Sequence, residues 1–219
     1  MAEYTSGSDK LHMAYSFAML SHDHSPKHFR NCIEGFMRDA PDGWPCWSFS
    51  NHDVQRHVTR WAKTPEMEEA VARQSINMLV SFPGTLGIYQ GEELGQTETD
   101  IEFHELQDLG NIDFWPDNKG RDGCRTPMVW ESSNSHGGFS SAPRTWLPVS
   151  HDHVHMSVGE QENDPSALVH HYRRAIAFRA AHPAIIVGDH DKVQYIGDEV
   201  YNIRRHECDE IVCAFKLSD

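Results

Sequence analysis

The sequence predicts an α/β fold built on a parallel sheet. Over residues 11–90, short apolar stretches alternate with helical patterns in the order strand, helix, strand, helix, strand. Both helical patterns begin at a hydroxyl residue followed by proline, first at Ser25-Pro26 and then at Thr64-Pro65. Such alternation favours parallel strands that are joined by crossover helices.

The first strand and the first helix are expected over residues 11–40. The apolar stretch "LHMAYSFAML" (11–20) has strand-like length. A helix is expected over 25–40, with Ser25 as N-cap and Pro26 as the first helical residue. "PDGWP" then has turn chemistry, and "CWSFS" (46–50) predicts a short buried strand.

The second helix is expected to start at Thr64, with Pro65 in its first position. Glutamates in the first turn suit the helix dipole. The expected inner face consists of Met67, Val71, Ile76, Leu79 and Val80. "SFPGT" ends this helix, and "LGIYQ" (86–90) is expected to be the third strand.

Regular pattern is scarce from 91 to 163, which is typical of a long functional loop. A last helix is expected over 164–182, with Asp164 as cap and with Leu168, Tyr172, Ile176 and Arg179 recurring about every fourth residue. Pro183 is expected to stop it. The tail alternates like antiparallel strands and ends inside that pattern, so the sequence is expected to be a fragment.

The composition excludes several classes of protein. Among 219 residues, 33 are acidic and 19 basic, which gives a net charge of −14 and argues against binding to nucleic acid or an anionic membrane. Neither a transmembrane span nor a signal peptide is expected. Five widely spaced cysteines without a CxxC pair indicate reduced thiols and a cytoplasmic location.

The expected second strand ends abruptly in Asn51, His52 and Asp53. In a parallel α/β barrel, residues at the carboxyl ends of strands line the active site. There, an aspartate can stabilise a developing cation and a histidine can bind a sugar hydroxyl. Taken alone, the triplet fits better with a turn that is closed by an Asx hydrogen bond and a helix cap.

Four motifs carry a resemblance to a known family. "SFSNHDVQR", "PGTLGIYQGEELG", "GRDGCRTPMVW" and "GGFSSAPRTWLPV", in this order and spacing, resemble the C-terminal half of family 13 glycoside hydrolases. The likeness is greatest to the α-glucosidase and oligo-1,6-glucosidase branch. It implies a TIM barrel that is followed by a small antiparallel β-domain, retaining hydrolysis of short gluco-oligosaccharides or disaccharides, and no cofactor.

The resemblance also implies roles for four residues. Asp53 matches the carboxylate that stabilises the transition state, and His52 matches a histidine that binds the glucose at the cleavage site. Arg121 matches an arginine that reaches the same sugar and the carboxylates. Glu98 matches a position that shapes the neighbouring subsite. A fixed carboxylate beside an oxocarbenium-like transition state supplies electrostatic stabilisation.

The family pattern also indicates what this sequence lacks. Retaining hydrolysis needs a nucleophile and an acid/base carboxylate about 5 Å apart, and no "GFRxD"-like nucleophile segment or acid/base strand end is found here. The expected organisation is a partial barrel at 1–183, with strands six to eight and a long active-site loop at 91–163. The start of the β-domain follows at 184–219. The chain alone is expected to be inactive.

Other interpretations remain open at this stage. Relatives that transfer glucose or isomerise sucrose share these motifs, and a non-catalytic interaction or sugar-binding fragment is a further alternative. The histidine clusters at 21–25 and 150–155 lack a cysteine partner at ligand spacing, so surface histidines are expected there and no metal site. Trp115, Trp130 and Trp146 could stack on sugars or pack in a core.

Overall fold

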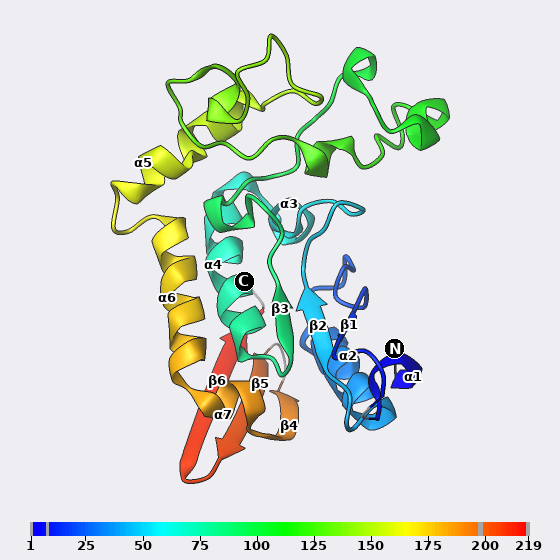
Figure 1. Ribbon diagram of the computed structural model, residues 1–219, viewed down its shortest axis with the longest axis vertical. Helices are drawn as coiled ribbons and strands as arrows, with labels where there is room; N and C mark the ends of the chain where they lie inside the picture. Colours follow the sequence, from blue (N-terminus) through cyan, green and yellow to red (C-terminus); the bar gives the residue numbers. More distant parts are fainter. Residues whose placement is uncertain (1, 8, 197–198, 218–219) are drawn as a thin grey trace. The chain divides into compact units, whose positions relative to one another are not determined.

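The computed structural model describes residues 2–7, 9–196 and 199–217 (Figure 1). The chain divides into two compact units. The first consists of Met1–Phe49, Gln74–Gly87 and Arg173–Asp219, and the second of Ser50–Arg73 and Ile88–Tyr172. All five cysteines are free thiols.

The first unit contains a parallel sheet with the order β1-β2-β3 (Figure 1). Its strands are β1 (Ala14–Tyr15), β2 (Pro45–Ser48) and β3 (Thr85–Gly87). Ala14 pairs with Pro45, and Cys46 pairs with Thr85. The prediction of a parallel sheet is therefore confirmed, but the first strand is much shorter than residues 11–20. The segment before it holds a helical turn, α1 (Ala2–Thr5), that the sequence analysis missed.

Helix α2 (Pro26–Asp39) matches the first predicted helix. The Ser25 hydroxyl accepts the His28 N–H at 3.2 Å, which confirms the predicted N-cap. The helix buries Phe29, Ile33 and Phe36. Phe29 packs edge-on against Phe49, with ring centroids 5.8 Å apart, so α2 supplies the aromatic part of this unit's core.

Two long helices start later than their capping residues predict. A 3₁₀ turn, η1 (Pro65–Met67), precedes α4 (Glu68–Ser81), and the Thr64 side chain makes no cap hydrogen bond. Helix α6 (Leu168–Ala181) follows a turn in which Asp164 accepts the Ser166 N–H at 2.8 Å. The predicted inner face of α4 is buried at Val71, Ile76, Leu79 and Val80, whereas Met67 is half-buried. Of the regularly spaced residues of α6, Leu168, Tyr172 and Arg179 are buried and Ile176 is exposed.

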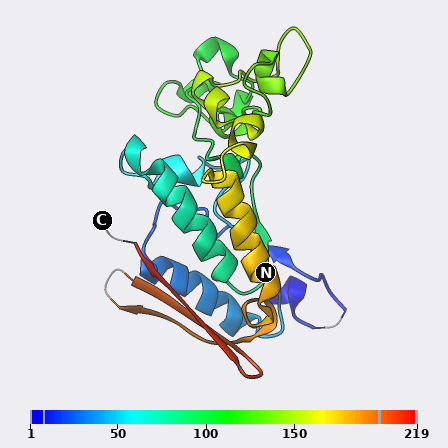
Figure 2. The same ribbon diagram turned by 90° about the vertical axis from the view of Figure 1, so that its left-hand side faces the viewer.

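The predicted antiparallel tail is confirmed. Strands β4 (Asp189–Ile196), β5 (Glu199–His206) and β6 (Asp209–Lys216) form a sheet in that order. Figure 2 shows α2 lying along this sheet, in agreement with the contacts of α2 with β4 and β5. Pro183 begins a further short helix, α7 (Pro183–Val187), which the sequence analysis did not predict.

The second unit holds the long loop and confirms that regular structure is scarce there. Helix α3 (His57–Trp61) begins four residues after Asp53, and α5 (Val158–Glu162) lies at the end of the loop. Between them lie short 3₁₀ turns, namely η2 (Glu92–Leu94), η3 (Phe103–Glu105), η4 (Leu109–Phe114), η5 (Asp122–Arg125), η6 (Ser135–Gly138) and η7 (His151–Met156). Among the described residues, the helices are all too short or too polar to cross a bilayer.

Large apolar side chains are exposed around the β1 edge of the parallel sheet. The set is Tyr4, Leu11, Met13, Tyr15 and Phe17. Tyr15 and Phe17 pack edge-on against each other at 5.2 Å. Strand β1 has a strand neighbour only on its β2 side within the described residues. The edge of this sheet is therefore apolar and uncovered.

Arg179 satisfies three backbone carbonyls inside the first unit. Its Nη1 donates to the carbonyls of Val80 at 2.6 Å and Phe82 at 2.8 Å, and its Nη2 donates to Gly84. The guanidinium is buried, so these bonds replace water on both sides.

Replacing Arg179 with methionine should lower the free energy of unfolding by about 2–4 kcal/mol, because three buried carbonyls lose their donor. Urea unfolding followed by circular dichroism measures this effect. Arg174→Met removes the same charge at an exposed position of the same helix and should change the free energy by less than about 0.5 kcal/mol. Equal losses in both variants would contradict this account of Arg179.

Candidate active site

The polar triplet after β2 forms a closed turn. The Asn51 side-chain oxygen accepts the Asp53 N–H at 2.8 Å, so the Asx hydrogen bond that the triplet suggested is present. Asn51 is buried, whereas the side chains of His52 and Asp53 are 67% and 36% exposed. The turn therefore fixes its first residue and presents the next two side chains outward.

Arg121 joins Asp53 to a second carboxylate. Its Nη1 donates to Asp53 Oδ1 at 2.8 Å, and its Nε and Nη2 donate to the two oxygens of Asp108 at 2.7 and 3.1 Å. Hydrogen bonds to Asp108, then to Asp53, raise the pKa of Arg121. The bidentate contact fixes the plane of the guanidinium, which in turn fixes Asp53 Oδ1.

A second arginine holds the same turn. Arg125 Nε donates to the His52 carbonyl at 2.7 Å, and its Nη2 lies 3.5 Å from Asp53 Oδ1. The other carboxylate oxygen, Asp53 Oδ2, lies 3.5 Å from His52 Nε2. Asp53 thus has one oxygen against two cations and one oxygen beside an exposed imidazole.

Asp122 fixes the position of Asp108. Its Oδ2 accepts the backbone N–H groups of Gln107 at 2.6 Å and of Asp108 at 2.8 Å. Asp122 is fully buried, and its Oδ1 has no hydrogen-bond partner among the described residues. Sequence reasoning missed Asp108, Asp122 and Arg125 as site residues. The signal for two of them was their place in "GRDGCR", directly after and four residues after Arg121.

The structure brings His52, Asp53 and Arg121 together, while the contacts of Glu98 lead elsewhere. Its carboxylate accepts the Arg56 N–H at 3.0 Å, and its own N–H donates to Thr59 Oγ1 at 2.8 Å. Burial raises the pKa of Glu98 to about 7. A Cβ at Gly123 would lie 2.4 Å from Glu98 Oε1, so this glycine is a steric requirement of the "GRDG" motif.

Buried charges lie beneath the turn. Arg56 is 1% exposed, donates from Nη1 to the Gln90 carbonyl at 2.8 Å and stacks on the Tyr89 ring, with Cζ 4.9 Å from the ring centroid. Its Nε and Nη2 have no hydrogen-bond partner among the described residues. Desolvation by burial lowers the pKa of Arg56, although nearby Tyr89, Cys124, Glu98 and Glu92 oppose this effect.

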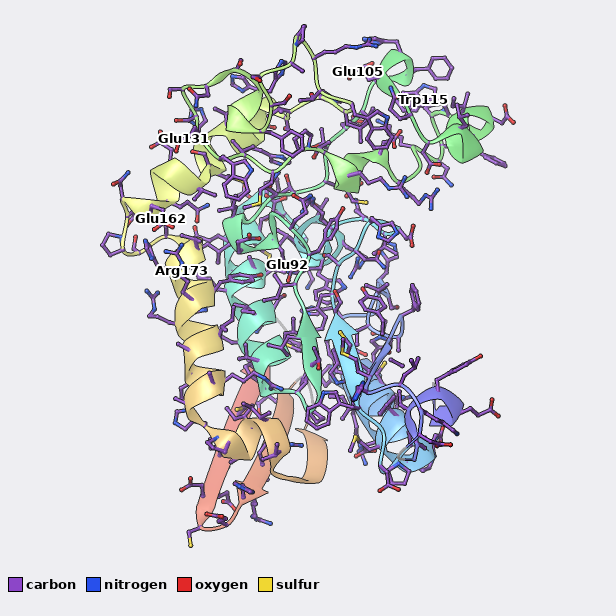
Figure 3. All side chains as sticks on the ribbon, viewed as in Figure 1. Glu92, Glu105, Trp115, Glu131, Glu162 and Arg173 are labelled. Atoms are coloured by element: carbon purple, nitrogen blue, oxygen red, sulfur yellow. The ribbon has the colours of Figure 1, made fainter. Side chains whose placement is uncertain are left out.

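Glu92, labelled in Figure 3, is also buried and interacts electrostatically with Arg56, so the two belong to one buried group. Its Oε2 accepts the Tyr89 N–H at 3.1 Å, and its Oε1 accepts the Tyr172 hydroxyl at 3.3 Å. His57 Nδ1 lies 3.8 Å from Oε1. His57 also donates its N–H to the Ser50 hydroxyl at 2.8 Å, so this group reaches the residue just before the triplet.

The prediction of surface histidines at 150–155 is wrong for His153. This side chain is buried, and its Nε2 accepts the Thr97 N–H at 3.2 Å. Burial, with a smaller contribution from Arg56, lowers its pKa to about 4. In the part of the chain that the structure describes, no three His, Cys, Asp or Glu side chains gather in a way that could hold a metal ion.

Glu92 should make stability depend on pH. Burial raises its pKa from the ordinary 4.5 to about 7, so its contribution is complete below about pH 4.5 and is lost as pH rises through about 7. The contribution of Glu98 to stability falls with rising pH in the same way, because its pKa is raised too. The contribution of His153 changes with pH in the opposite direction. Its pKa is lowered, so the stability that it contributes is lost as pH falls through about 4.

Comparison of wild type with Glu92→Gln isolates the pH-dependent contribution of Glu92 to stability. The free energy of unfolding of wild type relative to the variant should fall by about 2 kcal/mol from pH 5 to pH 8. Denaturant unfolding at several pH values measures the difference. Glu131→Gln, at an exposed position, is the control for the loss of a glutamate charge. A flat wild-type-minus-Glu92→Gln difference would refute the raised pKa.

Comparison with known proteins gives a consistent family assignment. The family described as "Alpha amylase, catalytic domain" matches residues 1–188. A "Probable alpha-glucosidase" of Rhizobium meliloti is 49% identical over 218 residues, which cover 99% of this chain and 39% of that protein. An "Oligo-1,6-glucosidase" of Halalkalibacterium halodurans is 25% identical over 226 residues, which cover 90% of this chain and 40% of that protein.

A solved structure supports the same assignment. The α-glucosyl transfer enzyme XgtA superposes with a TM-score of 0.91 at 39% identity, over 99% of this chain and 40% of that enzyme. The chain therefore spans about two fifths of the length of the proteins that it matches. Their catalytic-domain fold is the TIM barrel, of which this chain carries a part together with a small antiparallel sheet. The chain is a member of the α-amylase family, family 13 of the glycoside hydrolases.

Proposed function

We propose that the chain is part of a retaining α-glucosidase that removes terminal α-linked glucose from short oligosaccharides. The observation that carries this proposal is Asp53, a half-exposed carboxylate whose Oδ1 is fixed by Arg121 at 2.8 Å. Membership of the α-amylase family supports glycoside hydrolase chemistry. The names of the α-glucosidase and oligo-1,6-glucosidase relatives support the substrate class.

In this proposal Asp53 stabilises the transition state. As the glycosidic bond breaks, positive charge develops on the sugar ring, and a carboxylate that is already oriented needs no reorganisation. Arg121 and Arg125 hold Oδ1 and leave Oδ2 facing His52. The exposed His52 imidazole then binds a hydroxyl of the same glucose. Glu98 shapes the adjoining subsite through its contact with the Arg56 backbone.

The proposed place of the elements in the barrel follows the family pattern. Strands β1, β2 and β3 would be the sixth, seventh and eighth barrel strands, and their parallel order agrees with this. Helix α6 would be the last barrel helix. The barrel part would extend over 1–183, with the active-site loop at 91–163, and the β-domain would start at 184.

Hydrolysis in this mechanism also needs two further carboxylates. One attacks the anomeric carbon to form a glycosyl-enzyme, and the other protonates the leaving oxygen and then activates water. No segment of these 219 residues resembles the family's nucleophile motif. We therefore propose that the chain has no hydrolytic activity by itself.

Glucosyl transfer is the second candidate activity. The solved structure with 39% identity is named an α-glucosyl transfer enzyme. Transfer shares the glycosyl-enzyme and differs only in the acceptor, which is a sugar hydroxyl instead of water. Asp53, His52 and Arg121 would have the same roles in this reaction, and also in sucrose isomerisation.

A chimaera tests the proposed role of Asp53. The part of the Rhizobium meliloti protein that precedes its matched region is fused to this chain. The fusion should hydrolyse an aryl α-glucoside, whereas the 219-residue chain should not. Asp53→Asn should lower kcat of the fusion by about 10³-fold, because a neutral amide cannot stabilise the cationic transition state.

Asp100→Asn is the matched control, because Asp100 is exposed and is paired only with Lys119 among the described contacts. It should leave kcat within about threefold, since its ion pair involves neither Asp53 nor Arg121. An Asp53→Asn fusion with nearly full kcat would refute the assignment. Product analysis with and without an added sugar acceptor distinguishes hydrolysis from transfer.

Asp108→Asn tests whether the contact of Asp108 with Arg121, here called the anchor of Arg121, is needed for catalysis. An amide loses one charge-assisted bond of the bidentate pair, so the guanidinium and Asp53 should lose their fixed geometry. We expect kcat/KM of the fusion to fall by about 10²-fold, mainly through kcat. Asp117→Asn, at an exposed position of the same loop, should have no effect. A loss that appears only as lower thermal stability would contradict the positioning role.

A further inference from the structure

A cavity of about 610 Å³ lies within the long loop of the second unit. Its volume is in the range of small-molecule sites, which is roughly 300–1,000 Å³. The four segments that line it are 104–107, 134–137, 144–149 and 151–154. None of these segments includes Asp53, His52 or Arg121, so the candidate active site does not account for the cavity.

Trp146 presents its indole to this cavity. The side chain is 62% exposed, whereas the next residue, Leu147, is 1% exposed. The Thr145 hydroxyl donates to the Leu147 carbonyl at 2.6 Å, which fixes the backbone on both sides of the tryptophan. An exposed indole on a fixed backbone offers a flat apolar face, and such a face stacks on the apolar face of a sugar ring.

Planar polar side chains line the cavity together with Trp146. Arg144, Glu105, Gln107 and Asn134 all line the cavity, and Figure 3 shows Glu105 on its short turn. Guanidinium, carboxylate and amide groups each have paired hydrogen-bonding atoms that match two adjacent hydroxyls. This combination of one aromatic face and several planar polar groups suits a neutral sugar better than a purely apolar ligand.

One wall of the cavity is held in an unusual backbone conformation. His136, Gly137 and Gly138 have φ values of 52°, 60° and 71°. The Gly137 carbonyl accepts the N–H groups of Trp130 at 2.7 Å and Glu131 at 2.9 Å, which closes the turn. Left-handed conformations at a residue with a side chain persist where the surroundings fix them, and they are frequent at ligand sites.

The cavity adjoins the anchor of Arg121 along the chain. Gln107 lines the cavity, and its neighbour Asp108 holds Arg121. The buried carboxylate of Asp122 accepts the N–H groups of both residues. The same buried carboxylate therefore holds the backbone of a cavity-lining residue and of the residue that contacts Arg121.

We propose that this cavity is a second carbohydrate-binding site, in which Trp146 stacks on a glucosyl unit of a neutral gluco-oligosaccharide. The choice of glucose rests on the proposed function. The assignment of a sugar ring rests on the indole and the planar polar groups, and does not depend on whether the whole enzyme hydrolyses or transfers glucose.

Maltotriose binding to the 219-residue chain tests the proposal. Saturation-transfer NMR should show transfer from the protein to the sugar, and tryptophan fluorescence titration gives the affinity. Trp146→Ala should weaken binding by at least about tenfold, which corresponds to about 1.4 kcal/mol. Trp146→Phe keeps an aromatic face and should retain most of the affinity. Arg144→Ala should weaken binding without altering the stacking residue.

Two controls make each result decisive. Trp130→Ala removes an exposed indole that does not line the cavity, and it should bind maltotriose like wild type. Asp53→Asn should also bind like wild type. Absence of saturation transfer in wild type, or unchanged affinity in Trp146→Ala, overturns the proposal. Loss of binding in Asp53→Asn alone places the sugar at the candidate active site and likewise overturns it. An inactive chimaera with Trp146-dependent binding refutes only the proposed function.

Discussion

The geometry of the site depends on the ion pairs of Arg121 with Asp53 and Asp108. One planar group contacts two carboxylates from loop segments that are 55 residues apart in sequence, Asp53 and Asp108. The cation between the two aspartates offsets the repulsion of their carboxylates. The fork shape of arginine sets direction as well as charge, and a lysine ammonium could not reproduce that.

Two buried charged residues, Arg56 and Glu92, lie next to the site, and burying them costs free energy of desolvation. Two nitrogens of Arg56 have no hydrogen-bond partner among the described residues. Buried charges of this kind contribute little net stability but tolerate few alternative arrangements. Glu92 accepts the Tyr89 N–H in the turn after β3. His57 donates its N–H to Ser50, the residue just before the triplet. The exposed carboxylate is thus carried on a part of the chain that has little freedom to rearrange.

Much of the fold could be predicted because its signals are local. The helix after Ser25 and the parallel order of the strands follow from patterns within a few residues. The residues Thr64 and Asp164 misled the prediction, because a hydroxyl or carboxylate residue before proline also precedes 3₁₀ turns and tight turns, and not only α-helices. In the site, Asp53 and Arg121 were found by motif. Asp108 was missed because its partner is 13 residues away, across a loop without periodicity.

The apolar edge at β1 has a consequence for the behaviour of the chain in solution. Exposed Tyr15 and Phe17 favour contact between molecules, whereas a net charge of −14 keeps them apart. The repulsion acts over the Debye length, which shrinks from about 30 Å at 0.01 M salt to about 10 Å at 0.1 M, while apolar attraction is not weakened. Colloidal stability of this chain is therefore an electrostatic property, and low ionic strength favours the dispersed state.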